Sequence, residues 1–186
     1  MRRVFLIAGL MAAFGLAVLA VSAAAPANFA GTWLLDKAKS QGLSPRMQGA
    51  DSVTWTITQD GKTISIESKV TGGQPPAGGG GGGGGGMGGG RGPAGPQVYN
   101  LDGKETTADV TFGQATGKAT TKATWSSDGG TLELSRKTTF QGPNGEVTNS
   151  STQKLSLSGD GKVLTVVQHS EGARGVQDST LVFNKQ

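Results

Sequence analysis

The residue types that usually carry catalysis or metal binding are scarce in this chain of 186 residues. It contains no cysteine, which excludes disulfides, thiolate catalysis and cysteine-ligated metal. Its one histidine, His169, falls in the strand phase opposite Leu164 and Val166, so we expect it on an outer surface. The sequence contains neither a Gly-x-Ser-x-Gly nucleophile elbow nor a His-Glu-x-x-His motif. We therefore predict no enzyme, no metal site and no cofactor.

Arg136 is the residue whose position best suggests binding chemistry. It shares the strand phase of Leu132, Leu134 and Phe140, so its side chain is predicted to point inward. A buried guanidinium needs a partner with planar acceptors, and a ligand carboxylate held by two hydrogen bonds would supply one. Three alternatives need no ligand: a salt bridge to an internal acid, a bulge that turns Arg136 outward, or exposure at a rim.

The segments that must position Arg136 are short strands, because apolar residues recur with a period of two and long amphipathic helical windows are missing. The first expected strand carries Gly31-Thr32-Trp33. The others are expected at 52–59, 62–70, 98–101, 105–112, 118–125, 131–140, 146–157, 162–169 and 176–183.

Four Asp-Gly pairs separate these segments, at 60–61, 102–103, 128–129 and 160–161. Asp-Gly supplies the positive φ angles of a tight hairpin turn, so we expect each pair to join two adjacent antiparallel strands. In an up-and-down meander the four turns gather at one end, and the longer loops gather at the other. The predicted shape is a cup.

The strand phase divides the predicted interior into two halves. Near the Asp-Gly turns it is apolar, formed by Trp55, Ile57, Ile64, Ile66, Trp125, Leu132, Leu134, Leu155, Leu157, Leu164 and Val166. Farther from the turns it is mostly polar, formed by Ser68, Thr121, Arg136, Thr138, Phe140, Asn149, Ser151, Gln153 and Gln168. The tryptophans can serve either the core or a ligand.

The predicted fold is all-β, a single up-and-down antiparallel barrel of about eight to ten strands. A sheet of this length must close or split, because free edges pair with other chains. Closure would pair the strand of Gly31 and Trp33 with the strand of Leu181 and Phe183. A β-sandwich is the alternative, which tight sequential hairpins favour less than a meander.

Residues 1–27 resemble a secretory signal peptide, with Arg2-Arg3, an apolar run from Val4 to Val21 and then small residues. Cleavage after Ala24 or after Ala27 fits, and an uncleaved membrane anchor is the alternative. We expect a secreted or periplasmic protein with no stable membrane anchor after cleavage. Cleavage would take two positive charges from a formal net charge of +4, and the remaining basic residues are scattered, so we expect no nucleic-acid partner.

Residues 72–96 interrupt the predicted barrel domain of residues 28–186 with a glycine-rich stretch that includes nine consecutive glycines at 78–86. Such a stretch buries too little surface to offset its chain entropy, so we expect a disordered, flexible loop. It is either a tolerated insertion without a role or a mobile lid over the open end.

Gly31-Thr32-Trp33 at the start of a meander of hairpins resembles the lipocalin-like, or calycin, superfamily of β-barrels, over Phe29 to Lys185 apart from the glycine tract. The chain is also similar to small secreted bacterial proteins of this kind. The Thr-Asp-Tyr stretch and the cysteine pair of lipocalins do not occur. The resemblance implies a barrel that binds a small hydrophobic or amphipathic molecule, with Gly31 and Trp33 in a structural role that closes the barrel.

Two functions from different classes remain open from the sequence. The first is a barrel that binds a small amphipathic molecule in its interior. Its candidate binding residues are Arg136, Trp55, Trp125, Thr121, Thr138, Phe140, Ser151 and Gln153. The second is a non-catalytic envelope or interaction domain with a filled core. The sequence does not identify the ligand, the oligomeric state or the role of the glycine tract.

Overall fold

The computed structural model describes residues 25–72, 95–112, 115–142, 145–173 and 175–186. These residues form one ten-stranded antiparallel sheet and a short helix, α1 (Pro45–Gly49). The strands are β1 (Gly31–Leu35), β2 (Ser52–Gln59), β3 (Thr63–Thr71), β4 (Gln97–Asn100), β5 (Thr106–Phe112), β6 (Ala115–Trp125), β7 (Thr131–Gly142), β8 (Gly145–Leu157), β9 (Val163–Gly172) and β10 (Gly175–Lys185). The predicted all-β meander is confirmed.

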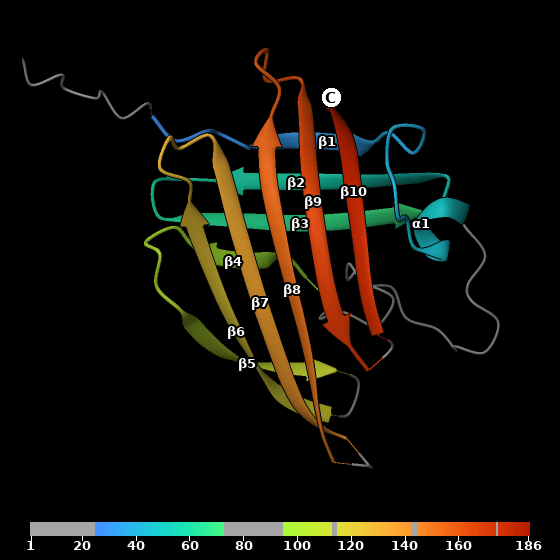
Figure 1. The fold of residues 1–186 in the computed structure, drawn as a ribbon, viewed down its shortest axis with the longest axis vertical. Coiled ribbons are helices and arrows are strands. Elements are labelled where there is room, and N and C mark those ends of the chain that lie inside the picture. Colours follow the sequence, from blue (N-terminus) through green and yellow to red (C-terminus); the bar gives the residue numbers. More distant parts are fainter. Residues whose placement is uncertain (1–24, 73–94, 113–114, 143–144, 174) are drawn as a thin grey trace, which may run out of the picture.

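The sheet closes by pairing its first strand with its last. Strand order is β4-β3-β2-β1-β10-β9-β8-β7-β6-β5, and in the β1–β10 ladder Trp33 lies opposite Lys185 and Leu35 opposite Phe183. In Figure 1, β1 to β4 run across the view and β6 to β10 run along it, so two groups of strands enclose the interior. The result is a nearly closed up-and-down barrel, as the sequence predicted.

One seam remains where β4 and β5 follow each other in the chain. These two strands are the ends of the hydrogen-bonded order, so they do not pair. A side-chain bond from Asn100 Nδ2 to Thr106 Oγ1 (2.8 Å) links them. The prediction that Asp102-Gly103 joins a hairpin is therefore wrong: β4 has only four residues, and they pair with β3 and not with β5.

In the Asp-Gly turns that join paired strands, the aspartate side chain accepts hydrogen bonds from neighbouring turn residues. After β6, Asp128 Oδ1 accepts from Ser126 Oγ (2.6 Å) and Gly130 N (3.0 Å), and the turn after β8 repeats the first contact with Ser158 and Asp160. The bond from Ser126 is the largest of the effects that lower the pKa of Asp128. Each turn follows an even-numbered strand of the meander, which places the turns at one end, as predicted.

The expectation that the Asp-Gly pairs have positive φ angles is only partly correct. Gly103, Gly129 and Gly161 have φ of 75°, 70° and 68°, but Gly61 does not have a positive φ, and neither does any described non-glycine residue. The connections are longer than the two-residue loop of a type I′ turn, in which both residues need a positive φ. Each Asp can therefore keep a φ that is not positive, and its side chain accepts hydrogen bonds from backbone N–H or serine hydroxyl groups. Asp60, for example, accepts from the backbone N–H of Lys62 and Thr63.

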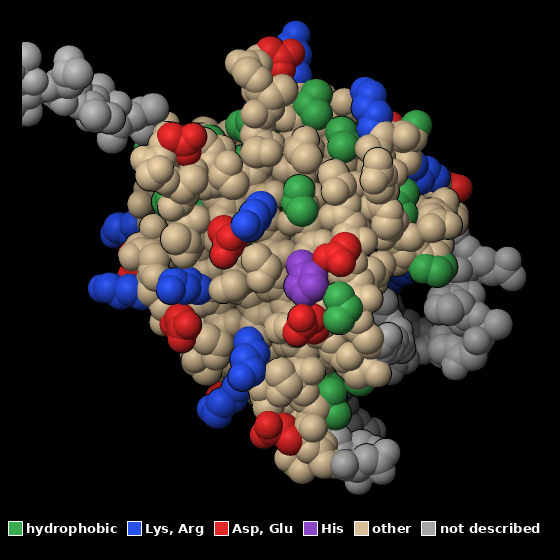
Figure 2. All heavy atoms as spheres, viewed as in Figure 1, with side chains coloured by type: hydrophobic (Ala, Val, Ile, Leu, Met, Phe, Trp, Pro, Cys, Tyr) green, Lys and Arg blue, Asp and Glu red, His purple; other side chains and the backbone are tan. Residues whose placement is uncertain are grey.

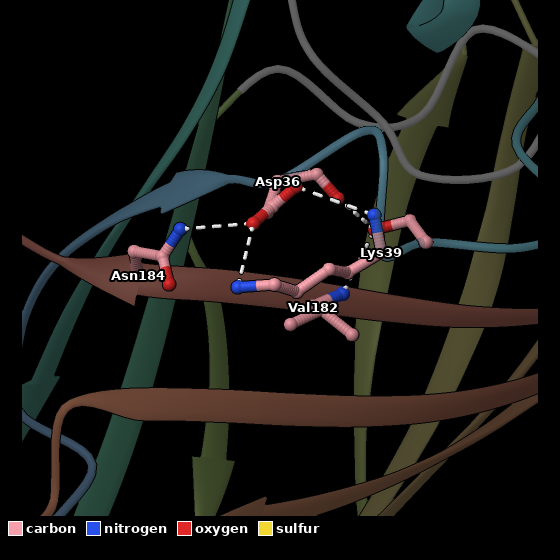
Figure 3. Close-up of polar contacts among 5 residues, drawn as sticks. Asp36, Lys39, Val182 and Asn184 are labelled. Atoms are coloured by element: carbon pink, nitrogen blue, oxygen red, sulfur yellow. Dashed lines mark hydrogen bonds and ion pairs between the residues drawn. The ribbon is translucent and has the colours of Figure 1, made fainter.

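The chain that leaves β1 stays beside β10. Asp36 N donates to Val182 O (2.7 Å), and the Asp36 carboxylate receives bonds from Lys39 and Asn184 (Figure 3). The side-chain bond from Lys39 is the largest of the effects that lower the pKa of Asp36. Farther on, Gly42 has a φ of 65°, and a Cβ there would come within 2.2 Å of Asp178 O. This segment therefore covers the edge of β10 that β1 leaves free.

The core fills the interior near the Asp-Gly turns and also extends along β1 and β2 to Leu35 and Val53, at the ends of these strands farther from the turns. Of the apolar set predicted from strand phase, Trp125 and Leu157 pack partly buried against the core and the other nine residues are buried. Trp55 packs against Phe183 in a tilted arrangement with ring centroids 4.6 Å apart, and Phe29 stacks on Trp125 at 5.9 Å. The alternating pattern of the sequence thus produced the expected inward face.

The predicted signal cleavage region up to residue 24 and residues 73–94 of the glycine tract lie outside the described residues. In the part of the chain that the structure describes, no helix is long and apolar enough to cross a membrane.

Closure through Phe183 generates a stability prediction. Replacing Phe183 with Ala should lower the free energy of unfolding by about 3–5 kcal/mol, because it removes a fully buried ring that packs against Trp55. The control is Val176→Ala on the same strand, where the side chain is 64% exposed, and it should change stability by less than about 0.5 kcal/mol. Urea unfolding followed by tryptophan fluorescence measures both. Equal losses in the two variants would contradict the assigned closure.

Candidate binding site in the barrel interior

The ladder register arranges the interior side chains of β6 to β10 in rows that run across the strands. The row nearest the Asp-Gly turns is apolar and consists of Trp125, Leu132, Leu155, Val166 and Leu181. The next row is mixed and consists of Ala123, Leu134, Gln153, Gln168 and Ser179. The third row is polar and consists of Thr121, Arg136, Ser151, Ser170 and Gln177. Polarity therefore rises along the barrel.

Arg136 lies in the polar row with its side chain half-buried. The ladders of β7 with β6 and β8 run without interruption through Arg136, so the alternative of a bulge is wrong. Its Nε donates to Thr138 Oγ1 at 3.4 Å, a long bond to a buried hydroxyl. Among the described residues, no carboxylate lies within ion-pair distance of this guanidinium. An internal salt bridge therefore does not account for it either.

Tyr99 lies on β4, in the other group of strands, and strand phase alone did not identify it. It is 2% exposed on β4, and its hydroxyl donates to Gln97 Oε1 at 3.1 Å. Burial raises the pKa of Tyr99 to about 12, and the positive charge of Arg136 opposes that rise. The charge of Arg136 therefore acts on the Tyr99 phenol. The available signal was that this is the only tyrosine in the chain.

Three further polar side chains are buried beside Arg136. Thr138, Gln153 and Gln168 are each 6% exposed. Gln153 and Gln168 lie directly opposite each other on β8 and β9, one row closer to the apolar end than Arg136. Polar side chains this deeply buried normally have hydrogen-bond partners.

The other candidate residues lie at different distances from this cluster. Thr121 and Ser151 flank Arg136 in the same row, and Phe140 lies farther along β7, half-buried. Trp55 is fully buried against Phe183, and its Nε1 has no hydrogen-bond partner. Trp125 lies two rows from Arg136. The structure thus groups Thr121, Thr138, Ser151 and Gln153 around Arg136 and leaves Trp125 at the apolar end.

Gly31 and Trp33 lie on β1, where the barrel closes. Trp33 is fully buried, its Nε1 donates to Phe29 O at 2.9 Å, and the Lys185 ammonium lies 5.2 Å from the center of its ring. Gly31 has a φ of 141°, and a Cβ there would approach Lys185 Cε to 2.9 Å. The lack of a side chain at Gly31 therefore leaves room for Lys185 to lie over Trp33.

His169 lies on the outer face, as its phase predicted. Its Nδ1 is 2.6 Å from Asp178 Oδ1 and its Nε2 is 3.1 Å from Glu171 Oε1, and Figure 2 shows the histidine between these acidic side chains. The bond to Asp178, followed by that to Glu171, raises the pKa of His169. Across the described ranges, no group of three or more His, Asp or Glu side chains is arranged to hold a metal ion.

The effect of the Arg136 charge on the pKa of Tyr99 generates a spectroscopic prediction. Arg136→Met should raise the pKa of Tyr99 above its wild-type value of about 12, because a positive charge that favours tyrosinate is lost. Since the chain has one tyrosine, an absorbance titration reports this group alone. Lys137→Met, at the exposed neighbouring position, should leave the titration unchanged. Circular dichroism confirms that the protein remains folded. A Tyr99 pKa that does not respond to Arg136→Met would contradict the arrangement.

Comparisons with known proteins give a limited result. No protein-family model matches the chain, and no curated protein matches its sequence. Among solved structures, the chain is similar to the zebrafish ileal bile acid-binding protein complexed with cholic acid. The alignment covers 85% of this chain and 98% of that one, with 17% sequence identity and a TM-score of 0.44. At these values the similarity assigns neither a ligand nor a function to this chain.

Proposed function

We propose that this protein is an exported barrel that binds a small amphipathic molecule, with the acidic head of that molecule held by Arg136. The observation that carries the proposal is the environment of Arg136. Its guanidinium points into the barrel, makes one long bond to Thr138 and has no carboxylate partner in the described residues.

The energetics favour an anionic partner at this position. The half-buried guanidinium of Arg136 loses part of its hydration, which charged or well-placed acceptors can replace. A carboxylate can accept two parallel hydrogen bonds from one guanidinium, which makes it the matching ligand group. The Tyr99 hydroxyl stays protonated at neutral pH, because burial raises its pKa to about 12, and a hydroxyl can also donate to a carboxylate.

The apolar rows suit the remainder of such a molecule. Between Arg136 and the end of the barrel with the Asp-Gly turns lies continuous buried apolar surface. It includes Leu134 and Leu181 on the long strands and Trp55 on β2. Burying hydrocarbon against such a surface contributes roughly 25 cal/mol per Å². We infer a binding protein and not an enzyme, because the one histidine lies outside the barrel, where it cannot act as a base in the interior.

Binding of long-chain fatty acids tests the proposal. Arg136→Met should weaken the binding of hexadecanoate at least about tenfold, since a hydrogen bond to a charged group contributes about 1.5–3 kcal/mol. Lys137→Met removes the same charge from the exposed neighbouring position and should leave the affinity unchanged. Titration calorimetry and displacement of a fluorescent apolar probe measure both.

Two results would contradict the proposal in different ways. Equal affinity in the wild type and Arg136→Met would reject the carboxylate assignment while leaving a binding barrel. No binding of any apolar probe or fatty acid by the wild type would favour the second function, a filled interaction domain.

Export requires its own test, because residues 1–24 are outside the described structure. We expect the protein purified from the periplasm or the medium of its host to lack its first 24 or first 27 residues, as the small residues around Ala24 and Ala27 suit signal peptidase. Intact mass spectrometry distinguishes the two cleavage sites. A full-length mass confined to the membrane fraction would support the uncleaved anchor instead.

A further inference from the structure

Resting on the proposed function, we propose that Gln153 and Gln168 form a second polar subsite, which recognises a hydroxyl or carbonyl on the body of the ligand. The preferred ligand is then an amphipathic carboxylic acid that carries a second oxygen function, and not an unsubstituted fatty acid.

The first observation is that these two amides lack partners. Each residue is 6% exposed, and across the described ranges neither amide has a hydrogen bond to another protein group, although they lie opposite each other in the β8–β9 ladder. Neither amide is among the fully buried atoms that lack a partner, so both keep a small contact with water. A glutamine amide offers two N–H donors and a carbonyl acceptor. A ligand that displaces this water without bonding to the amides would leave them unpaired, at a cost of about 1–3 kcal/mol each. A ligand that bonds to the amides avoids that cost.

The second observation is where the amides lie. Gln153 and Gln168 occupy the row between the apolar end and the row of Arg136. In the row of the amides, Gln153 lies opposite Leu134 and Gln168 opposite Ser179, so the two amides are placed between hydrocarbon and hydroxyl neighbours. A ligand that extends from Arg136 toward the apolar end must pass them.

Row spacing sets the expected separation of the two polar groups of the ligand. Gln153 and Ser151, which lies opposite Arg136, are two residues apart on β8, so the rows are about 7 Å apart at 3.3 Å per residue. The second oxygen should therefore be about 7 Å from the carboxylate, roughly the sixth carbon of an extended chain. A hydroxyl fits both amides because it donates and accepts.

The same geometry predicts discrimination against a plain hydrocarbon chain. Methylene groups placed beside the two amides would displace any water that solvates them and would leave them unpaired. Hydrogen-bonding sites reject analogues that lack the bonding group for this reason. The subsite therefore distinguishes acids that carry a second oxygen from acids that do not, while Arg136 binds the carboxylate that all of them share.

The experiment compares two probes on four forms of the mature protein. The probes are hexadecanoate and its analogue with one hydroxyl at about the sixth carbon. The protein forms are the wild type, Gln153→Leu, Gln168→Leu and Gln141→Leu, which makes the same substitution at an exposed position of β7. Calorimetric titration gives each affinity, and circular dichroism establishes that each variant is folded.

We expect the wild type to bind the hydroxylated acid about tenfold or more tightly than hexadecanoate, which corresponds to about 1.4 kcal/mol. Gln153→Leu and Gln168→Leu should each reduce this preference below about threefold, because the hydroxyl loses a partner and the hydrocarbon chain no longer lies beside an unpaired amide, and Gln141→Leu should keep the preference. Gln168→Met serves as a second variant if either leucine variant does not fold.

Three outcomes would overturn the proposal, and they are separable from failure of the proposed function. Equal wild-type affinities for the two acids, or a preference that survives both substitutions, would reject the second subsite while a fatty-acid-binding barrel remains. If the wild type binds neither acid, the proposed function fails and the subsite fails with it.

Discussion

The pairing of β1 with β10 is the constraint on which the rest of this structure depends. β1 has only five residues, and three of them pair with β10, so the ladder alone is a weak closure. Side chains reinforce it: Trp33 bonds to Phe29 O and lies under the ammonium of Lys185. The chain after β1 then continues along β10, with Asp36 bonded to Val182 O and Asn184. An open sheet would expose both of these strands as edges that other chains could pair with.

Closure creates an interior whose two halves serve different purposes. The half near the turns is an ordinary core, where Trp55 packs against Phe183 and the leucines at 132, 134, 155, 164 and 181 are fully buried. Farther from those turns, β7 to β9 contribute Arg136, Gln153 and Gln168, and among the described residues no hydrogen bond joins these three side chains to one another. Buried polar groups without partners lower stability, so the apolar half must provide the free energy that keeps the barrel folded. Departures of this kind are expected where a protein binds something.

Much of the barrel was predictable because β-structure has a strict period. Side chains alternate between the two faces of a strand, so placing one residue inside or outside places all the others on that strand. This alternation assigned Arg136 and Gln153 to the interior and His169 to the exterior. The Asp-Gly turns gave the boundaries of the strands. Their detailed geometry was less predictable, since Gly61 and Gly129 occupy the same place in the pattern but only Gly129 has a positive φ. Loop length decides that angle, and the sequence does not specify where a ladder stops.

The sequence by itself determined the strand order in the meander, the face to which each side chain points and the gradient from apolar to polar residues, because all three follow from local alternation and short connections. Only the tertiary structure decided which residues meet. Tyr99 is 37 positions from Arg136 in the chain, yet burial and the guanidinium charge both act on its pKa. The seam between β4 and β5 and the segment beside β10 were likewise decided by three-dimensional packing. Contacts across a closed barrel depend on how far the sheet curves before it meets itself, and that curvature is a property of all ten strands together.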